Sequence, residues 1–476
     1  MAADTKPSRG TTIALIVASA MFMQNLDSAI INTSLPKMAL SFRVSTVDLS
    51  LGITAYMLAS AAISPLASWL SDRFGARAVL AGSVLLFTLA SVGCGMATNL
   101  PLFVIARLLQ GTGGALMMPV GMEVVLRNVA KSELMQATAL TVWPALVAPI
   151  LGPVLGGFIT QMFNWRWNFW LNLPIGLAGA IAVLICIPKT TAEHQRKLDL
   201  GGFALCSVAL TCLLSGFQRS SVAGSARTMA IGLIAVGLAA GVMAVRHMRS
   251  SPAPLLSLGP LSRTSFSHAT LLPGALFRGM FSTAPFLLPL LFQLGFGLSP
   301  VQAGGWVLVY FAGNLGIKPV TTQILKSFGF RNVSCFNGGL VGLTMLACGF
   351  ITPATPKLLL VVLLFAAGAT RSMQMTSLMT LTFADIPGPE KSAASTLHSM
   401  LQQTATAAGV AAGAFLMALF AGLDHVTTVG LPELHRSFLA IGAVALAGAA
   451  VFWRMPADIG SEVSLHRLRN AGSTDG

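Results

Sequence analysis

Charged residues are scarce in this chain of 476 residues. Aspartate, glutamate, lysine and arginine together make up only 9% of it, and the acidic residues are the rarer, 15 against 29 basic ones. Apolar side chains account for 54% of the residues, and the mean hydropathy is +0.77. A soluble domain could not sustain this composition, and no polar stretch between the apolar runs is long enough to form one. The composition therefore predicts a protein embedded in a lipid bilayer.

Sequence motifs of ATP-driven pumps, enzymes and metal proteins are also missing. No GxxxxGKS or GxxxxGKT phosphate loop occurs, which argues against ATP as the energy source. No HExxH or GxSxG motif occurs, and the histidines are scattered. The six cysteines lie in apolar segments without a CxxC pair, as small core residues do. We therefore expect no enzymatic activity, no metal and no cofactor.

Long apolar runs are what the chain has in abundance. We count fourteen that could cross hydrocarbon, which takes an α-helix of about 20 residues. The first follows Lys6 and Arg9 but is too long for a signal peptide and contains Asp27. The sequence thus predicts an all-α integral membrane protein. The predicted spans are 12–35, 49–71, 78–98, 101–123, 135–161, 168–188, 200–218, 228–245, 264–293, 301–320, 332–352, 358–381, 393–420 and 437–455.

The basic residues predict the orientation of these spans. With the N-terminus in the cytoplasm, most of the 29 lysines and arginines fall in inward-facing segments, as the positive-inside rule requires. Both termini are then cytoplasmic. The formal net charge of +14 mostly faces an anionic inner leaflet, so no nucleic-acid partner is needed to explain it.

A short pattern occurs twice in the chain. Residues 70–77 read LSDRFGAR and residues 324–331 read ILKSFGFR, with Phe, Gly and Arg in register. We interpret this as an internal repeat of two six-helix bundles, residues 1–190 and 256–476, the second followed by a short cytoplasmic tail. Two extra membrane helices lie between them in residues 191–255. Repeated halves around a site near the bilayer midplane are typical of secondary transporters.

Asp27 is the one charged residue between positions 10 and 36. An ionised carboxylate near the bilayer centre costs about 2.5–3.5 kcal/mol, so we interpret Asp27 as a proton or substrate site. A carboxylate neutralised by a neighbouring helix for packing is the alternative. Arg107, in the fourth span, keeps its proton and is the natural partner. If Arg107 leaves when Asp27 is protonated, proton binding is coupled to conformational change. Glu123 lies nearer the end of that span and is expected to reach headgroup water.

The second half carries buried cations in place of an acid. Arg278 and Arg371 lie near the middle of their spans, and Lys318 lies toward the cytoplasmic end of its span. No acid lies inside the predicted spans of this half to neutralise them. We hypothesise that the substrate supplies the missing anion, because the planar guanidinium suits carboxylate or phosphate. Pairing of these cations with backbone carbonyls is the alternative. His398 is more typical of a packed or solvated residue than of a ligand.

Five motifs in order make the chain resemble the major facilitator superfamily, specifically its group of fourteen-span drug:proton antiporters. The chain is similar to this group in the first span, in the loop after the second span (with Ser68 in place of the usual leading glycine), in the fourth and fifth spans and at the sixth-span entry. These motifs lie at residues 26–36, 70–77, 107–114, 152–157 and 165–176. The resemblance implies the major facilitator fold, a gating loop with Asp72, Arg73, Gly75 and Arg77, and an antiporter motif with Gly152, Pro153, Gly156 and Gly157.

Together these features predict a proton-coupled efflux transporter of the bacterial inner membrane. It would export small molecules or drugs, with a leaning toward anionic or carboxylate substrates, and would work as a monomer. Asp27 and Arg107 would couple the proton, and Arg278, Arg371 and Lys318 would bind substrate. Two alternatives stay open: a uniporter-like metabolite exporter without proton coupling, and an exporter of lipophilic cationic drugs.

Overall fold

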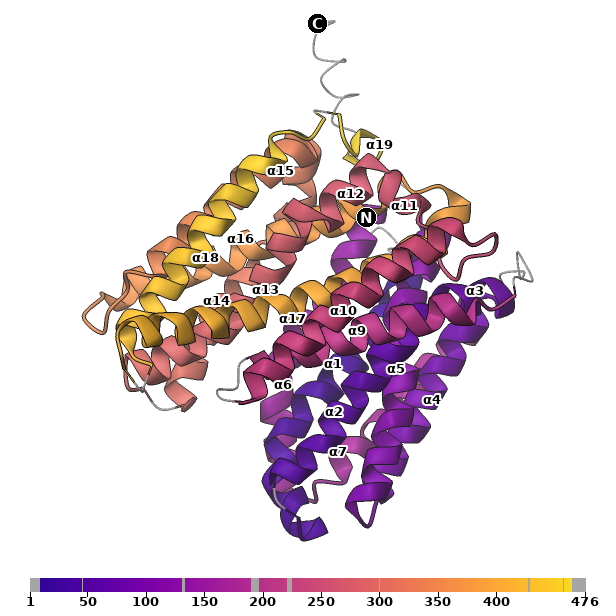
Figure 1. Cartoon of the computed structure of the whole chain (residues 1–476), viewed down its shortest axis with the longest axis horizontal. Helices are drawn as coiled ribbons and strands as arrows, with labels where there is room; N and C mark the ends of the chain where they lie inside the picture. The colour runs from indigo at the N-terminus through magenta and orange to yellow at the C-terminus, as the bar shows by residue number, and fades with distance from the viewer. Residues whose placement is uncertain are drawn as a thin grey trace, which may run out of the picture. The chain divides into compact units, whose positions relative to one another are not determined.

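A computed structural model describes residues 9–44, 46–130, 133–189, 197–220, 225–298, 300–426, 429–456 and 458–464 (Figure 1). Within these ranges the regular secondary structure is entirely helical. The longer helices are α1 (Arg9–Phe42), α2 (Thr46–Ile63), α3 (Ala67–Phe74), α4 (Ala76–Met96), α5 (Leu100–Asn128), α6 (Leu134–Met162), α8 (Asn172–Cys186), α9 (Leu200–Ser220), α10 (Ser225–Ser250), α13 (Leu272–Leu290), α14 (Pro300–Gly316), α15 (Lys318–Cys348), α16 (Lys357–Phe383), α17 (Lys391–Leu423) and α18 (Leu431–Phe452).

Short helical pieces join some of these elements. The 3-10 turn η1 (Ser64–Leu66) connects α2 to α3, and the π-helical turn η3 (Leu291–Gly295) follows α13. The remaining pieces are α7 (Trp167–Trp170), α11 (Gly259–Ser262), α12 (Thr264–Thr270), η4 (Gly388–Glu390) and α19 (Ser461–Ser464).

Eleven helical segments in the described ranges are long and apolar enough to cross a membrane. The all-α membrane class is therefore confirmed, whereas the count of fourteen spans stays a prediction. Three predicted spans fall outside the eleven: 135–161, 301–320 and 332–352. The first coincides with α6, several of whose side chains are outside the described set. The second is divided because α14 ends at Gly316, and the third belongs to α15, which also carries Lys318, Lys326 and Arg331.

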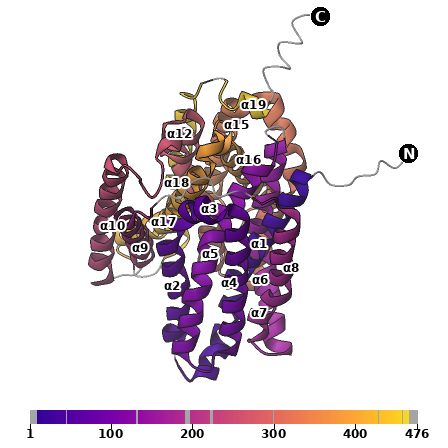
Figure 2. The ribbon, with the colours of Figure 1, turned by 90° about the vertical axis from the view of Figure 1, so that its right-hand side faces the viewer.

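The chain divides into two compact units. The first contains Met1–Thr211, Gly237–Leu258 and Pro387–Met400. In it α1 lies along α6, α4 along α5 and α8, and α2 along α5 (Figure 2). Its core is built from fully buried side chains of α1, α4 and α5, among them Ile13, Phe87 and Met117. These helices bring the polar residues of the first half together.

The second unit contains Cys212–Val236, Gly259–Ile386 and Leu401–Gly476. In it α15 lies along α18, and α14 along α16 (Figure 1). Phe277 of α13 stacks on Phe452 of α18 with ring centroids 5.4 Å apart. Both helices of the predicted insertion, α9 and α10, are formed, and each contributes residues to both units. The division at 1–190, 191–255 and 256–476 remains a proposal.

The two copies of the repeated pattern have the same local backbone. Gly75 adopts φ 82° and ψ 135° where α3 ends, and Gly329 adopts φ 73° and ψ 164° within α15. This left-handed, extended region is essentially restricted to glycine. A proline precedes each glycine by ten residues, Pro65 in η1 and Pro319 at the start of α15. Each half therefore bends a helix and then turns the chain sharply in the same way.

The repeat extends to the only two tyrosines of the chain. Tyr56 and Tyr310 each precede the corresponding proline by nine residues. A Cβ atom on Gly111 of α5 would lie 2.4 Å from the Tyr56 carbonyl oxygen. A Cβ atom on Gly368 of α16 would lie 1.8 Å from that of Tyr310. In both units the helix that carries the tyrosine thus crosses a neighbour so closely that only glycine fits.

Candidate functional site

A buried ion pair forms the centre of the first unit. Arg107 of α5 donates from Nη1 to Asp27 Oδ2 of α1 at 2.9 Å, and both side chains are 1% exposed. The two residues predicted to couple protons are therefore brought together by the fold.

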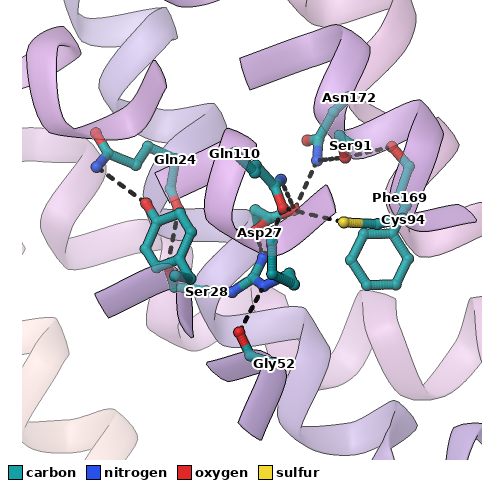
Figure 3. A network of polar contacts seen from close by, with 11 residues as sticks. Gln24, Asp27, Ser28, Gly52, Ser91, Cys94, Gln110, Phe169 and Asn172 are labelled. Carbon is teal, nitrogen blue, oxygen red and sulfur yellow. Dashed lines mark hydrogen bonds and ion pairs between the residues drawn. The ribbon is translucent and has the colours of Figure 1, made fainter. Parts of the chain in front are cut away.

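Two amides complete the coordination of the carboxylate (Figure 3). Gln110 Nε2 and Asn172 Nδ2 both donate to Asp27 Oδ1, at 2.9 and 2.8 Å. Asn172, at the start of α8, also donates to Ser91 Oγ at 2.9 Å, which in turn donates to the Phe169 carbonyl. Asp27 thus accepts three hydrogen bonds from α5 and α8.

Arg107 is also surrounded on its other sides. Its Nη1 donates to Gln110 Oε1 at 2.7 Å and its Nε to the Gly52 carbonyl at 3.4 Å. Its guanidinium carbon lies 4.4 Å from the centre of the Tyr56 ring, and the Tyr56 hydroxyl accepts a hydrogen bond from Gln24 Nε2 at 3.2 Å. The positive charge therefore has an ion pair, a carbonyl and an aromatic face as partners.

This arrangement has a definite response to a proton. Protonation of Asp27 removes the negative charge that balances Arg107 and turns one acceptor oxygen into a donor. Arg107 cannot lose its own proton to compensate. The buried cation must then find another anion or move toward water, because an unpaired charge in a low-dielectric interior is costly.

Gln110 and Asn172 contact the Asp27 carboxylate, and the sequence did not single them out. Both lie within motifs identified in the sequence, but amides are frequent in polar packing and carry no charge. Gln110 follows Arg107 by three residues and so lies on the same helix face. Asn172 is a polar residue at the entry of an otherwise apolar helix. The spacing of Gln110 from Arg107 and the place of Asn172 at a helix entry are the sequence features that could have indicated their contact with Asp27.

The predicted gating loop lies at the junction of α3 and α4. Arg73 is exposed and stacks near the rings of Trp69 and Phe74, 5.4 and 5.7 Å from their centres. Arg77 donates from Nη2 to the carbonyl of Leu184. Gly75 makes the turn, and Asp72 is half-buried. The structure therefore places the four residues on one turn but does not bring them into the Asp27 centre.

The beginning of α17 packs against this part of the first unit. Ser392 Oγ donates to Ser68 Oγ at 3.1 Å, so the hydroxyl that replaces the usual glycine has a partner. Lys391 donates to the Leu126 carbonyl and Ser395 to the Pro119 carbonyl, both on α5. Three side chains of α17 are thus held by α3 and α5.

The expectation that Glu123 reaches headgroup water was wrong. Glu123 is 2% exposed, and its Oε1 accepts from Arg127 Nε at 2.8 Å. Arg127 lies one turn further along α5 and supplies the counter-charge itself, with 15% of its side chain exposed. The pair therefore replaces the solvent contact that the sequence position suggested.

The antiporter motif lies in α6, which is helical throughout it. Gly152 is buried, and a Cβ atom there would lie 2.4 Å from Cβ of Ala29, so α1 and α6 approach closely at this point. The Gly156 carbonyl accepts a long hydrogen bond from Asn168 Nδ2 at 3.4 Å, whereas Gly157 has no neighbour that a Cβ would meet within 4 Å. The Pro153 side chain lies outside the described residues. Gly152 thus shows the close packing expected of the motif, and Gly157 does not.

Arg278 of α13 is buried, and each of its three side-chain nitrogens donates a hydrogen bond. Its Nε donates to the Ala269 carbonyl at 3.2 Å, its Nη1 to Gln402 Oε1 at 3.1 Å and its Nη2 to Thr382 Oγ1 at 3.0 Å. Neutral oxygens from α12, α16 and α17 therefore surround the cation. This arrangement matches the carbonyl-pairing alternative more closely than an open substrate site.

Arg371 and Lys318 are coordinated less completely. Arg371 Nε donates to the Phe281 carbonyl at 3.0 Å, but its Nη1 is buried without a hydrogen-bond partner among the described residues. Lys318 Nζ donates to Thr376 Oγ1 at 2.7 Å. The hydrogen bond to Thr376 places Lys318 against α16, the helix that carries Arg371, whereas Arg278 is hydrogen-bonded separately.

One acid was missed in the second half. The helix expected at 437–455 begins at Leu431, and Glu433 in its first turn is 4% exposed. Its Oε2 accepts from the Gly430 backbone N–H at 2.8 Å and so caps α18. Across the described residues, no group of three or more His, Cys, Asp or Glu side chains is placed to hold a metal ion.

The fold and the buried Asp27–Arg107 centre define a multi-pass membrane transporter. The chain belongs to the Major Facilitator Superfamily, whose family model matches residues 17–410. It is 34% identical over 465 residues to the "Putative multidrug resistance protein MdtD" of Klebsiella pneumoniae subsp. pneumoniae, covering 96% of this chain and 97% of that one. Its identity to the protein of the same name in Escherichia coli K12 is also 34%, over 463 residues, with the same coverage.

Solved structures support the same fold. The proton:xylose symporter XylE aligns with a TM-score of 0.63 at 13% identity, covering 97% of this chain and 99% of that one. The human organic anion transporter MFSD10 aligns with a TM-score of 0.62 at 16% identity, covering 94% and 100%. At such identities the likeness concerns the fold alone. The chain is thus a major facilitator transporter and not an enzyme, as the sequence predicted.

Proposed function

We propose that the protein is a proton-coupled exporter of small molecules or drugs in the bacterial inner membrane. The observation that carries the proposal is the Asp27–Arg107 pair, 1% exposed and completed by Gln110 and Asn172. The multidrug resistance proteins to which the chain is similar support export as the direction of transport. The inner membrane, cytoplasmic termini, a monomeric state and the absence of a cofactor belong to the same proposal.

The cycle follows from the chemistry of the pair. In the ionised state Asp27 holds α5 to α1 through Arg107. A proton entering from the outside neutralises Asp27, releases Arg107 and permits the rearrangement that opens the site to the other side. Loss of the proton to the cytoplasm restores the ion pair. Gly152 would allow α1 and α6 to slide at close contact, and the loop with Asp72, Arg73, Gly75 and Arg77 would latch the cytoplasmic end.

The three cations of the second unit favour an anionic or carboxylate substrate. Arg278, Arg371 and Lys318 have no carboxylate at ion-pair distance among the described residues. Each elementary charge that crosses the membrane is worth about 2.3 kcal/mol per 100 mV. An anion is driven outward by an inside-negative potential, whereas a lipophilic cation needs the proton more. Cation export and proton-independent export are the alternatives.

Transport by the full chain in proteoliposomes tests the proposal. An imposed pH gradient should drive salicylate or ethidium across the membrane, and Asp27→Asn should lose the gradient dependence. Asp385→Asn, which changes an exposed carboxylate, is the matched control and should behave as wild type. Transport by Asp27→Asn that still responds to the pH gradient would refute coupling through this residue.

A further inference from the structure

Four polar residues lie where α14 and the start of α15 pack against α16 in the second unit. Tyr310, Asn314 and Lys318 follow one another at intervals of four residues, and Arg371 lies opposite them on α16. A Cβ atom on Gly368 would lie 1.8 Å from the Tyr310 carbonyl oxygen and 3.0 Å from the Asn314 backbone nitrogen. This face of α14 is therefore in direct contact with α16 at Gly368, which precedes Arg371 by three residues.

Several polar atoms of this group are buried and have no hydrogen-bond partner. Tyr310 and Asn314 are 0% exposed, whereas Arg371 and Lys318 are half-buried. The Tyr310 hydroxyl, both polar atoms of the Asn314 side chain and Arg371 Nη1 make no hydrogen bond to any described residue. A buried polar atom without a hydrogen bond destabilises the fold. Four such atoms on neighbouring residues call for an explanation, and a polar ligand would supply their partners.

The positive charges of Arg371 and Lys318 favour a negatively charged ligand. Arg371 lies on α16, and Lys318 reaches the same helix through its hydrogen bond to Thr376. Lys318 uses one of its three N–H donors on Thr376. In the described part of the chain no carboxylate pairs with either cation. A phenol, an amide, an ammonium and a guanidinium offer donors to one region, and the missing partner is an acceptor that carries negative charge.

The tyrosine at the same place in the first unit has a hydrogen-bond partner. The Tyr56 hydroxyl accepts from Gln24 Nε2, whereas the Tyr310 hydroxyl makes no hydrogen bond to any described residue. Arg278, one helix away in the chain, donates from all three of its nitrogens, whereas Nη1 of Arg371 does not. Tyr310 and Arg371 thus have donors to spare that Tyr56 and Arg278 lack.

We infer that Tyr310, Asn314, Lys318 and Arg371 form the binding site for an oxyanion group, a carboxylate or a phosphate, of the transported substrate. This inference rests on the proposed transport function and narrows its substrate class. Arg371 provides a charged N–H from Nη1, Lys318 the second positive charge, and Tyr310 and Asn314 neutral donors. Arg278, whose three nitrogens already donate to protein oxygens, lies outside this site.

Equilibrium binding to the full chain tests this site independently of transport. The probes are salicylate and phenyl phosphate, with salicylamide and phenol as their neutral counterparts. We expect the purified protein in phosphatidylcholine nanodiscs to prefer the anions. Arg371→Gln should weaken their binding at least tenfold, and Tyr310→Phe about tenfold, as for hydrogen bonds to charged groups. Arg454→Gln, an exposed arginine in the same unit, should leave binding unchanged.

Stability measurements separate a binding role from a structural one. Tyr310→Phe and Asn314→Leu remove polar atoms that have no partner in the empty protein, so thermal stability should stay the same or rise. Equal binding of the neutral probes, no binding of either anion, or unchanged anion affinity in all variants would overturn the site. Loss of binding that only follows loss of stability would overturn it too.

Two further measurements identify the source of the bound anion and show whether the binding site or the proton coupling is wrong. If phosphatidylglycerol replaces the probes in an Arg371-dependent manner and the probes do not bind without it, the occupant is a lipid headgroup and the substrate assignment is wrong. Asp27→Asn should still bind salicylate. If this binding persists while gradient-driven transport is absent even in wild type, the site stands and the proposed proton coupling fails.

Discussion

Arg107 Nη1 lies 2.9 Å from Asp27 Oδ2, with both side chains 1% exposed. Two charges so deeply buried lose their hydration, and only their mutual attraction and the surrounding amides offset the loss. The pair is therefore stable as a unit and poorly tolerant of losing either member. This property makes it suitable as an element that responds to a single proton.

Removing one member of the pair should be more harmful than removing both. Asp27→Leu leaves Arg107 buried without its counter-charge and should lower the free energy of unfolding by about 3–5 kcal/mol. The double variant Asp27→Leu/Arg107→Met should recover most of this loss while remaining inactive. Thermal unfolding in detergent measures both. A double variant no more stable than Asp27→Leu would contradict the account.

The amide donors should hold the Asp27 carboxylate in place for transport. Asn172→Ala removes one of the two donors on Asp27 Oδ1, so the carboxylate is less firmly oriented toward Arg107. We expect gradient-driven transport in proteoliposomes to become slower. Asn128→Ala, whose side chain bonds to the Val124 carbonyl of its own helix, serves as the control. An unchanged rate in Asn172→Ala, or equal losses in both variants, would count against the hydrogen bond as the cause.

The repeated turn should require glycine in both halves. Gly75→Ala and Gly329→Ala place a Cβ atom at φ 82° and 73°, which costs about 1–3 kcal/mol each. Gly82→Ala and Gly339→Ala are the matched controls, because a Cβ atom at either position meets nothing within 4 Å. We expect lower melting temperatures only in the first two. If the controls lose as much stability, the turn geometry is not responsible.

A titratable contact ties α9 to α10. Partial burial raises the pKa of Asp199, but the Gly202 N–H, His247 and the Leu255 N–H more than offset it, so the pKa lies below its ordinary value. His247 Nε2 is 2.9 Å from Asp199 Oδ1. A depressed carboxylate pKa stabilises the fold above the unfolded value of about 3.9, and the stabilisation is lost as the pH falls through the lower folded value.

Asp199→Asn should therefore lower the melting temperature at neutral pH. The difference from wild type should shrink as the pH falls below about 4, where the carboxylate of the unfolded wild-type chain takes up a proton. It should disappear once the pH is below the lower pKa of Asp199 in the folded protein. Asp385→Asn, at an exposed aspartate, should show no such pH dependence. A difference that stays constant from neutral to acidic pH would mean that the carboxylate's charge has no part in the contact.

The sequence identified the ion pair but not its full coordination. An acid and an arginine stand out in apolar spans because their burial is so costly, and a single acid in the first span leaves few choices of partner. Gln110 and Asn172 did not stand out, since amides are tolerated in many helix contacts. Their role depends on how α5 and α8 approach α1, which residue spacing does not specify.

The substrate side was less predictable for a similar reason. Arg278, Arg371 and Lys318 looked alike in the sequence, yet the fold gives Arg278 three neutral acceptors and leaves Arg371 Nη1 without one. Whether a buried polar atom finds a partner is decided by tertiary packing. Tyr310 and Asn314 became candidates only once their neighbours were known. Glu123 was misjudged because its position near a helix end suggested water, whereas Arg127 supplies the contact.

The protonation of Asp27 during transport is the central claim, and infrared difference spectroscopy tests it directly. Substrate added to the wild-type protein at a pH that supports transport should alter the C=O stretching band of a protonated carboxyl group. This band should be absent in Asp27→Asn and present in Asp385→Asn. The same band in Asp27→Asn, or proton-driven transport by wild type without any carboxyl band, would contradict the proposal that Asp27 carries the proton.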